Sequence, residues 1–175
     1  MEHTNKIIGM VMVILSTTAY GIILGRDIKL RLKELKELKK IVFLLKGEIG
    51  FLHTPLLEAL ENVSFRCDEP FKQMLLDFVR FGRESNRRPF VEIWEEGISA
   101  GIGKTHLSKE EKQLLLNFGK ELGLSDIKTQ QNAMDSFLNE LEMSINSLEK
   151  TVPNKVKLYN SMGIMLGIVI AIIMI

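Results

Sequence analysis

Residues 26–52 read RDIKLRLKELKELKKIVFLLKGEIGFL, and their spacing decides the fold class. Apolar residues recur every three or four positions, at Ile28, Leu32, Leu35, Leu38, Val42, Leu45, Ile49 and Leu52. Most of the charged residues fall between them, which is the pattern of a helix with one apolar face. An uncharged run ends just before Arg26, so we expect a single helix to continue from that run into this segment.

The chain carries an uncharged run at each end. Residues 7–24, IIGMVMVILSTTAYGIIL, number 18, and residues 159–175, YNSMGIMLGIVIAIIMI, number 17. A helix needs roughly 17–25 apolar residues to cross a bilayer. The first run exceeds the roughly 7–15 apolar residues of a signal peptide and lacks a convincing cleavage site. A buried soluble helix is the alternative for the second run. Two runs around a polar middle favour transmembrane helices at 1–25 and 158–175.

The basic residues predict how these helices are oriented. Eight Lys or Arg and three Asp or Glu lie between Arg26 and Lys46, whereas Lys6 alone precedes the first run. Because Lys and Arg next to a membrane helix favour the cytoplasm, we expect residues 26–157 there and both termini across the membrane. The basic residues nearest the membrane have two interpretations, contact with anionic lipid or a solvated helix face.

The middle of the chain shows helix boundaries and no sustained alternation typical of strands. Proline at 55, 70 and 89 marks helix starts, with Thr54 as an expected N-cap. Ser108 and Glu111 have the spacing of a capping box. Gly123 suits the left-handed position after a helix, Ser125 or Asp126 caps the last helix, and Pro153 is expected to kink or break it. We predict an all-α, six-helix antiparallel cytoplasmic bundle flanked by two transmembrane helices.

Residues 97–108, GISAGIGKTHLS, contain part of a phosphate-binding P-loop. Gly103-Lys104-Thr105 matches the end of G-x-x-x-x-G-K-[ST], but Ile98 stands where the first glycine is needed. A P-loop also follows a buried strand, whereas residues 90–98 have helical spacing. We therefore interpret this stretch as a glycine turn between helices, with Lys104 and Thr105 exposed to solvent.

The composition gives little support for an enzyme. His3, His53 and His106 lack a second ligand at metal spacing, and the single Cys67 excludes an internal disulfide. No acid–base pair or activated nucleophile is recognisable. The 23 basic and 22 acidic residues nearly balance, which gives no argument for nucleic acid. We expect no catalytic site, no cofactor, no metal and no nucleic-acid partner.

Each apolar run contains two glycines four residues apart. They are Gly21 and Gly25 in the first run, and Gly163 and Gly167 in the second. Such pairs allow the backbones of membrane helices to approach closely. The two helices are expected to pack either on each other or against another subunit, and the sequence leaves both possibilities open.

Three segments resemble the stage III sporulation protein AB family of endospore-forming bacteria. Residues 47–60, GEIGFLHTPLLEAL, are similar to the family's E-I-x-x-x-x-T-P-L-x-x-A-L pattern. Residues 90–98 place Trp94 at the family's tryptophan. Residues 115–130, LLNFGKELGLSDIKTQ, are similar to L-x-x-F-G-x-x-L-G-x-S-D-x-x-x-Q, which ends at Gln130. We interpret the motif residues mainly as caps and sites of close packing: Thr54, Pro55, Gly119, Gly123, Ser125 and Asp126.

The resemblance implies a scaffold function. The family is similar to the cytoplasmic domain of platform proteins in type II secretion and type IV pilus systems, a six-helix antiparallel bundle. It implies docking of a secretion-type ATPase to a channel-like complex between mother cell and forespore, together with membrane proteins of the same operon. The implied location is the outer forespore membrane, with the bundle in the mother-cell cytoplasm. The alternative is a helical membrane adaptor or signalling protein with another cytoplasmic partner.

Charge and expected loop position suggest where a partner would dock. Exposed charged residues between the predicted short helices are the natural candidates, because loops carry much of the binding function in proteins. We selected Glu58, Glu61, Arg66, Arg83, Arg87 and Arg88.

Overall fold

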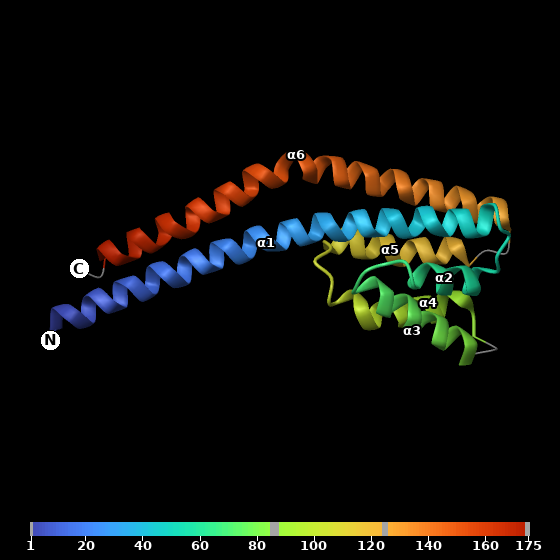
Figure 1. Cartoon of the computed structure of the whole chain (residues 1–175), viewed down its shortest axis with the longest axis horizontal. Helices are drawn as coiled ribbons and strands as arrows, with labels where there is room; N and C mark the ends of the chain where they lie inside the picture. The colour runs from blue at the N-terminus through green and yellow to red at the C-terminus, as the bar shows by residue number, and fades with distance from the viewer. Residues whose placement is uncertain (1, 85–87, 124–125, 174–175) are drawn as a thin grey trace. The chain divides into compact units, whose positions relative to one another are not determined.

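The computed structural model is built from six helices within residues 2–84, 88–123 and 126–173, with side chains described from residue 9 (Figure 1). They are α1 (Glu2–Gly50), α2 (Leu56–Ser64), α3 (Phe71–Glu84), α4 (Phe90–Ile102), α5 (Lys109–Leu122) and α6 (Ile127–Ile173). The described residues contain no strand. The predicted all-α order, with long first and last helices around four short ones, is confirmed.

The contacts divide the chain into two compact units. One combines Met1–Leu32 with Ser147–Ile175, and the other is Lys33–Asn146. Both α1 and α6 continue without a break through the predicted borders at 25/26 and 157/158, so those borders stay a prediction. Helix α6 also continues through Pro153, so this proline does not break the helix.

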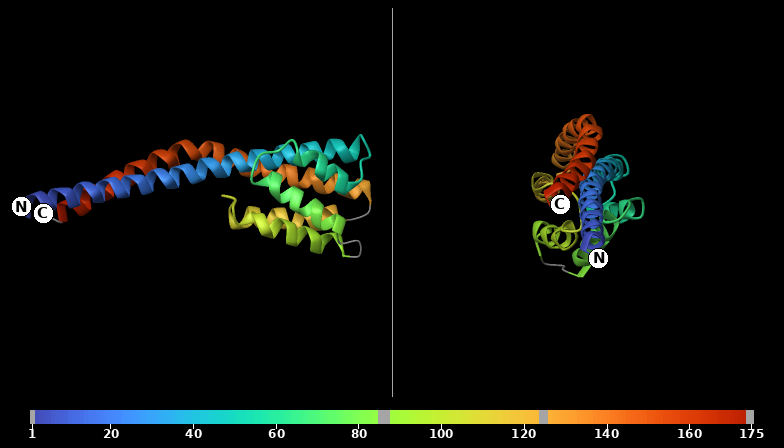
Figure 2. Two further views of the ribbon diagram at one scale, coloured as in Figure 1. Left: turned by 60° about the horizontal axis from the view of Figure 1, so that its bottom comes forward. Right: turned by 90° about the vertical axis from the view of Figure 1, so that its left-hand side faces the viewer.

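In the first unit, the beginning of α1 and the end of α6 lie side by side in opposite directions, with both chain ends at the same end of the pair (Figure 2). Both helices are long and apolar enough to cross a membrane. Large apolar side chains point outward along both: Val11, Met12, Leu15, Tyr20, Ile22, Ile23, Leu158, Met162, Ile164, Met165, Leu166, Ile168, Val169, Ile172 and Ile173.

The second unit has an apolar core to which all six helices contribute. Most of the predicted α1 face is buried, namely Leu35, Leu38, Val42, Leu45 and Ile49. Leu52 was also expected to face the core, but it is 68% exposed. This expectation was wrong because α1 ends at Gly50, before Leu52.

Aromatic rings run through this core from α3 to α6. The Phe78 ring meets the rings of Phe90 and Trp94 edge to face, at centroid distances of 5.2 Å and 5.3 Å. Trp94 contacts Phe118 at 6.3 Å, and Phe118 stacks on Phe137 at 4.3 Å. These rings join four consecutive helices, and such pairs add about 0.5–1.5 kcal/mol each beyond simple burial.

Candidate functional site

The motif residues Trp94 and Gly119 meet where α4 crosses α5. Trp94 is buried, and its indole Nε1–H donates a hydrogen bond to the Leu115 carbonyl at 3.3 Å. A Cβ on Gly119 would lie 2.1 Å from the Cδ1 and Nε1 atoms of Trp94. Only glycine therefore lets the indole lie against the α5 backbone in this position.

The motif residues after α5 hold the start of α6. The Asp126 carboxylate accepts hydrogen bonds from the Thr129 hydroxyl and backbone N–H, which keep the pKa of Asp126 below its usual value. Gln130 Nε2 donates to the Leu122 carbonyl at 2.9 Å, which satisfies an acceptor left open at the end of α5. Ser125, the alternative cap, lies outside the described residues.

Gly123 was expected in the left-handed region, and this was wrong. Its φ is −68°, which any residue can adopt. The need for glycine comes instead from packing, because a Cβ here would lie 2.8 Å from Cδ1 of the Phe90 ring. Gly119 and Gly123 thus both make room for aromatic rings of α4.

Thr54 and Pro55 form the turn between α1 and α2, although not as expected. Pro55 occupies the N-cap position, and no side chain caps α2 there. The Thr54 hydroxyl instead donates to the Glu48 carboxylate at 3.2 Å, and Asn62 Nδ2 donates to the same oxygen. Thr54 therefore ties the end of α1 to the turn, and its assignment as an N-cap was wrong.

The partial P-loop follows a helix, α4, and not a strand. Lys104 is exposed, as expected, but Thr105 is only 7% exposed and its hydroxyl donates to the Ile102 carbonyl at 2.7 Å. The expectation of an exposed Thr105 was wrong because the turn folds back on the end of α4. Ser108 and Glu111 then form the reciprocal hydrogen bonds of a capping box at the start of α5.

One polar contact of this turn is not visible in the sequence. Glu34 of α1 is buried, and its carboxylate accepts the His106 backbone N–H at 2.7 Å and meets His106 Nδ1 at 2.8 Å. Glu34 stands between the apolar positions of α1 like its solvated neighbours. Only the fold brings it to a residue 72 positions away.

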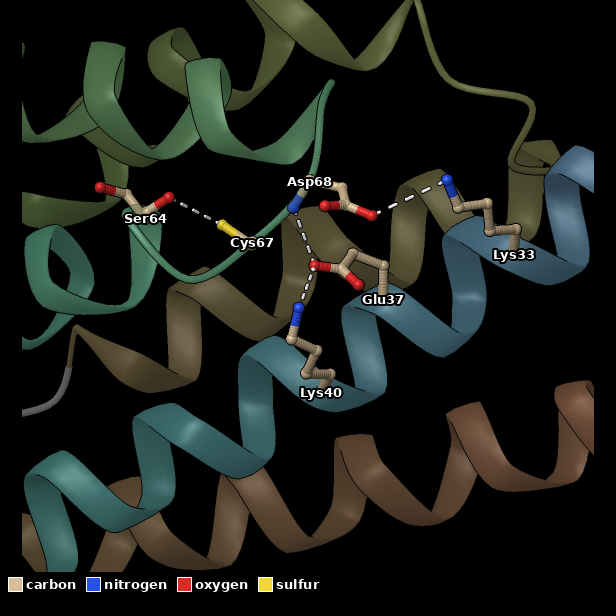
Figure 3. A network of polar contacts seen from close by, with 6 residues as sticks. All are labelled: Lys33, Glu37, Lys40, Ser64, Cys67 and Asp68. Atoms are coloured by element: carbon tan, nitrogen blue, oxygen red, sulfur yellow. Dashed lines mark hydrogen bonds and ion pairs between the residues drawn. The ribbon is translucent and has the colours of Figure 1, made fainter.

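A second polar network joins α1 to the segment between α2 and α3 (Figure 3). Glu37 Oε1 accepts from the Asp68 backbone N–H at 2.9 Å and from Lys40 Nζ at 3.0 Å. Beside it, Cys67 donates to the Ser64 carbonyl at 3.3 Å. Burial, reinforced by the nearby Glu37 carboxylate, raises the pKa of the Cys67 thiol to about 11. Within the described part of the chain, no group of three or more His, Cys, Asp and Glu residues could hold a metal ion.

Of the charged residues selected as partner contacts, Glu58, Arg66, Arg83 and Arg88 are exposed, and Glu61 is half-buried. Arg83 forms an ion pair with Glu61, and Arg88 pairs with Glu96 at 2.7 Å and with Glu92 at 3.5 Å. The side chains of Glu58 and Arg66 are exposed and form no ion pair or hydrogen bond with any described residue. Arg87 lies outside the described residues. Among the selected residues that the structure describes, Glu58 and Arg66 are therefore the ones whose charges are available to a partner.

The glycine pairs lie where α1 and α6 touch in the first unit. A Cβ on Gly21 would lie 2.5 Å from the Tyr159 carbonyl oxygen, and a Cβ on Gly163 would lie 2.7 Å from the Thr17 carbonyl oxygen. The Cα atoms of Gly21 and Gly163 face each other across this contact, which we call the glycine seam. A Cβ on Gly25 would meet its nearest side-chain atom at an ordinary 3.4 Å. A Cβ on Gly167 would lie 2.5 Å from the Thr17 hydroxyl oxygen and 2.9 Å from the Ile14 Cα. The close approach within the chain therefore involves Gly21, Gly163 and Gly167.

Three comparisons identify proteins similar to this chain. The family described as Stage III sporulation protein AB matches residues 6–175. Stage III sporulation protein AB of Bacillus subtilis (strain 168) is 24% identical over 172 residues, which cover 97% of this chain and 98% of that protein. A solved structure of the same name has a TM-score of 0.64 at 24% identity, covers 71% of this chain and 97% of its own, and shows the same fold. Because the family match extends over almost the whole sequence, the chain belongs to the stage III sporulation protein AB family.

Proposed function

We propose that the chain is a membrane-anchored scaffold that docks a cytoplasmic secretion-type ATPase to a channel-like complex between mother cell and forespore. The main support is the contrast between the two units. One unit exposes large apolar side chains along paired helices, and the other has a buried apolar core under a charged surface. Membership of a sporulation family supports a function in spore development.

The proposed anchor is the pair formed by the beginning of α1 and the end of α6. Fully burying one large apolar side chain is worth about 1.5–3 kcal/mol, so this many outward side chains favour lipid over water strongly. The basic residues of 26–46 follow directly and favour a cytoplasmic location for the bundle. In the implied setting, the membrane is the outer forespore membrane and the bundle lies in the mother-cell cytoplasm, beside other membrane proteins of the same operon.

The proposed docking surface includes Glu58 and Arg66. Charges already paired within the chain, such as Arg83 and Arg88, must break or share those contacts to bind a partner. Exposed charges without such partners can pair at once, which mainly raises the association rate and fixes orientation. In this arrangement the partner ATPase carries the P-loop, and the chain carries none.

Co-purification of the full chain in detergent with the secretion-type ATPase encoded beside it tests the proposal. We expect a complex at micromolar concentration that the double variant Glu58→Lys, Arg66→Glu weakens. The matched control is Lys39→Glu, Glu142→Lys, which also leaves the net charge unchanged and exchanges the two partners of an exposed ion pair elsewhere on the bundle. Absence of a complex with the folded chain contradicts ATPase docking, and a different cytoplasmic protein bound through the bundle supports the adaptor function instead.

A further inference from the structure

The helices α5 and α6 border a groove on the surface of the second unit. The groove consists of two depressions of about 450 Å³ and 400 Å³. Both depressions are lined by Leu114, Asn117 and Glu140, so they form one continuous channel along the two helices. A channel that follows two helices has the elongated form needed to hold a third helix.

Each helix contributes one stripe of side chains to this groove. On α5, Glu110, Leu114, Asn117 and Glu121 follow one another at intervals of three or four residues. Phe137, Glu140 and Met143 do the same on α6. Since residues at this spacing share a helix face, the groove is a regular feature of both helices over about three turns.

Apolar side chains lie in the floor of the groove, between polar ones. The stacked rings of Phe118 and Phe137, 4.3 Å apart, close it from below, and Leu114 lies half-buried beside them. Met143 is 65% exposed at its edge. An exposed methionine beside an apolar floor offers adaptable contact area, as on surfaces that bind amphipathic helices.

The rim of the groove is acidic. Glu110, Glu121 and Glu140 are exposed, and neither Lys nor Arg is among the described residues that line the groove. Lys120 of α5 is turned away from it and pairs with Glu95 of α4 at 3.3 Å. The whole chain has a net charge of only +1, so this negative rim is a local feature.

We propose that the α5–α6 groove binds a basic amphipathic helix of another protein. The apolar face of such a helix covers the floor, and its Lys or Arg residues pair with the acidic rim. Residues 26–46 are the basic amphipathic segment of this chain, but they cannot occupy the groove of a second copy. The apolar face of this segment, which includes Leu35, Leu38 and Val42, is buried in its own bundle. The proposal does not depend on the identity of the ATPase.

The test uses the full chain in nanodiscs of uncharged lipid and a fluorescent synthetic peptide. The peptide has roughly 18 residues, enough for a stable helix, with Leu on one face and Lys on its flanks. Two control peptides have either Glu in place of Lys or the same composition in scrambled order. Binding is followed by fluorescence anisotropy, with the signal from empty nanodiscs subtracted.

We expect the Lys–Leu peptide to bind, and the double variant Glu121→Lys, Glu140→Lys to weaken binding at least tenfold. Met143→Glu, at an exposed position on the edge of the groove, should weaken binding similarly because it removes an apolar contact. The matched variant Glu84→Lys, Glu92→Lys changes the charge equally on another surface and should change affinity less than twofold.

Several results would overturn the proposal. One is that the scrambled peptide binds as tightly as the Lys–Leu peptide. Another is that the matched variant loses as much affinity as the groove variant. A third is that the peptide signal does not exceed that of empty nanodiscs. Light scattering adds one more: a dimer that the groove variants dissociate would show that a second copy occupies the groove. ATPase docking is unaffected by any of these results, because it is measured by co-purification and through Glu58 and Arg66.

Discussion

At the scale of single residues, the absence of a Cβ at two glycines determines how α4 packs against α5. Trp94 can lie on α5 only because Gly119 has no Cβ, and the Phe90 ring has the same relation to Gly123. Glycine inside a helix costs about 1 kcal/mol relative to alanine. Here that cost is offset by the burial of large rings between α4 and α5.

Replacing Gly119 with alanine should therefore destabilise the protein despite the better helix propensity. The new methyl group would overlap the Trp94 ring, and overpacking of this kind costs about 1–3 kcal/mol. Gly47→Ala is the control, because a Cβ at Gly47 meets no atom within 4 Å and should stabilise α1 slightly. Denaturant unfolding followed by the fluorescence of Trp94, the single tryptophan, measures both. Equal stability of the two variants would contradict the packing argument.

The Cys67 thiol gives a second prediction at this scale. Its folded pKa of about 11 lies above the usual value of 9.0, so the folded state favours the neutral thiol. This contribution to the free energy of unfolding is fully present below pH 9 and is lost as the pH rises towards 11. The free energy of unfolding of Cys67→Ala should therefore decrease less between pH 9 and pH 11 than that of the unsubstituted protein. Alkylation by iodoacetamide at neutral pH should likewise be slow until the protein unfolds, and rapid alkylation of the folded chain would contradict this pKa.

At the scale of elements, α1 and α6 each serve two environments. Their halves in the second unit bury one face in the core, whereas their ends in the first unit touch through glycines and expose apolar side chains elsewhere. Lipid offers no hydrophobic driving force between membrane helices, so close backbone contact is a main source of their association. The glycine seam supplies that contact.

Substitutions in the glycine seam should therefore have graded effects. Gly21→Ala and Gly163→Ala would press a methyl group on a backbone carbonyl, which cannot move aside easily, and should separate the helices. Gly25→Ala is the matched control, because its Cβ would make an ordinary contact with the Val156 side chain. Pulsed electron spin resonance between labels at Tyr20 and Met162, in a Cys67→Ala background, should show longer distances for the first two variants only. Unchanged distances in all three variants would show that Gly21 and Gly163 are not needed to hold α1 against α6.

At the scale of the whole molecule, the division of surface chemistry between the two units is the main feature. Most large apolar side chains face outward in one unit and inward in the other. This division supports the proposed membrane anchor. The basic residues between Arg26 and Lys46 support the proposed orientation, with the bundle in the cytoplasm.

This orientation predicts opposite labelling at two positions. A cysteine at Asn146, an exposed residue of α6, should react with a membrane-impermeant maleimide only when the cytoplasmic face is accessible, as in inverted vesicles. A cysteine at Thr4, before the first apolar run, should react only in intact spheroplasts. Labelling of both positions from the same side would contradict the double crossing, and carbonate extraction of the full chain would contradict membrane insertion.

Periodicity and capping chemistry were enough to predict the six helices, because both depend on residues close together in the sequence. The buried face of α1, the capping box at Ser108 and Glu111, and the two apolar ends could all be read in this way. The tertiary structure alone decided why Gly119 and Gly123 are glycines, what Thr54 and Glu34 bind, and which surface charges are already paired. It also decided that α5 and α6 together form an acidic groove. These features depend on atoms brought together from distant parts of the chain, and a local pattern holds no information about such distances.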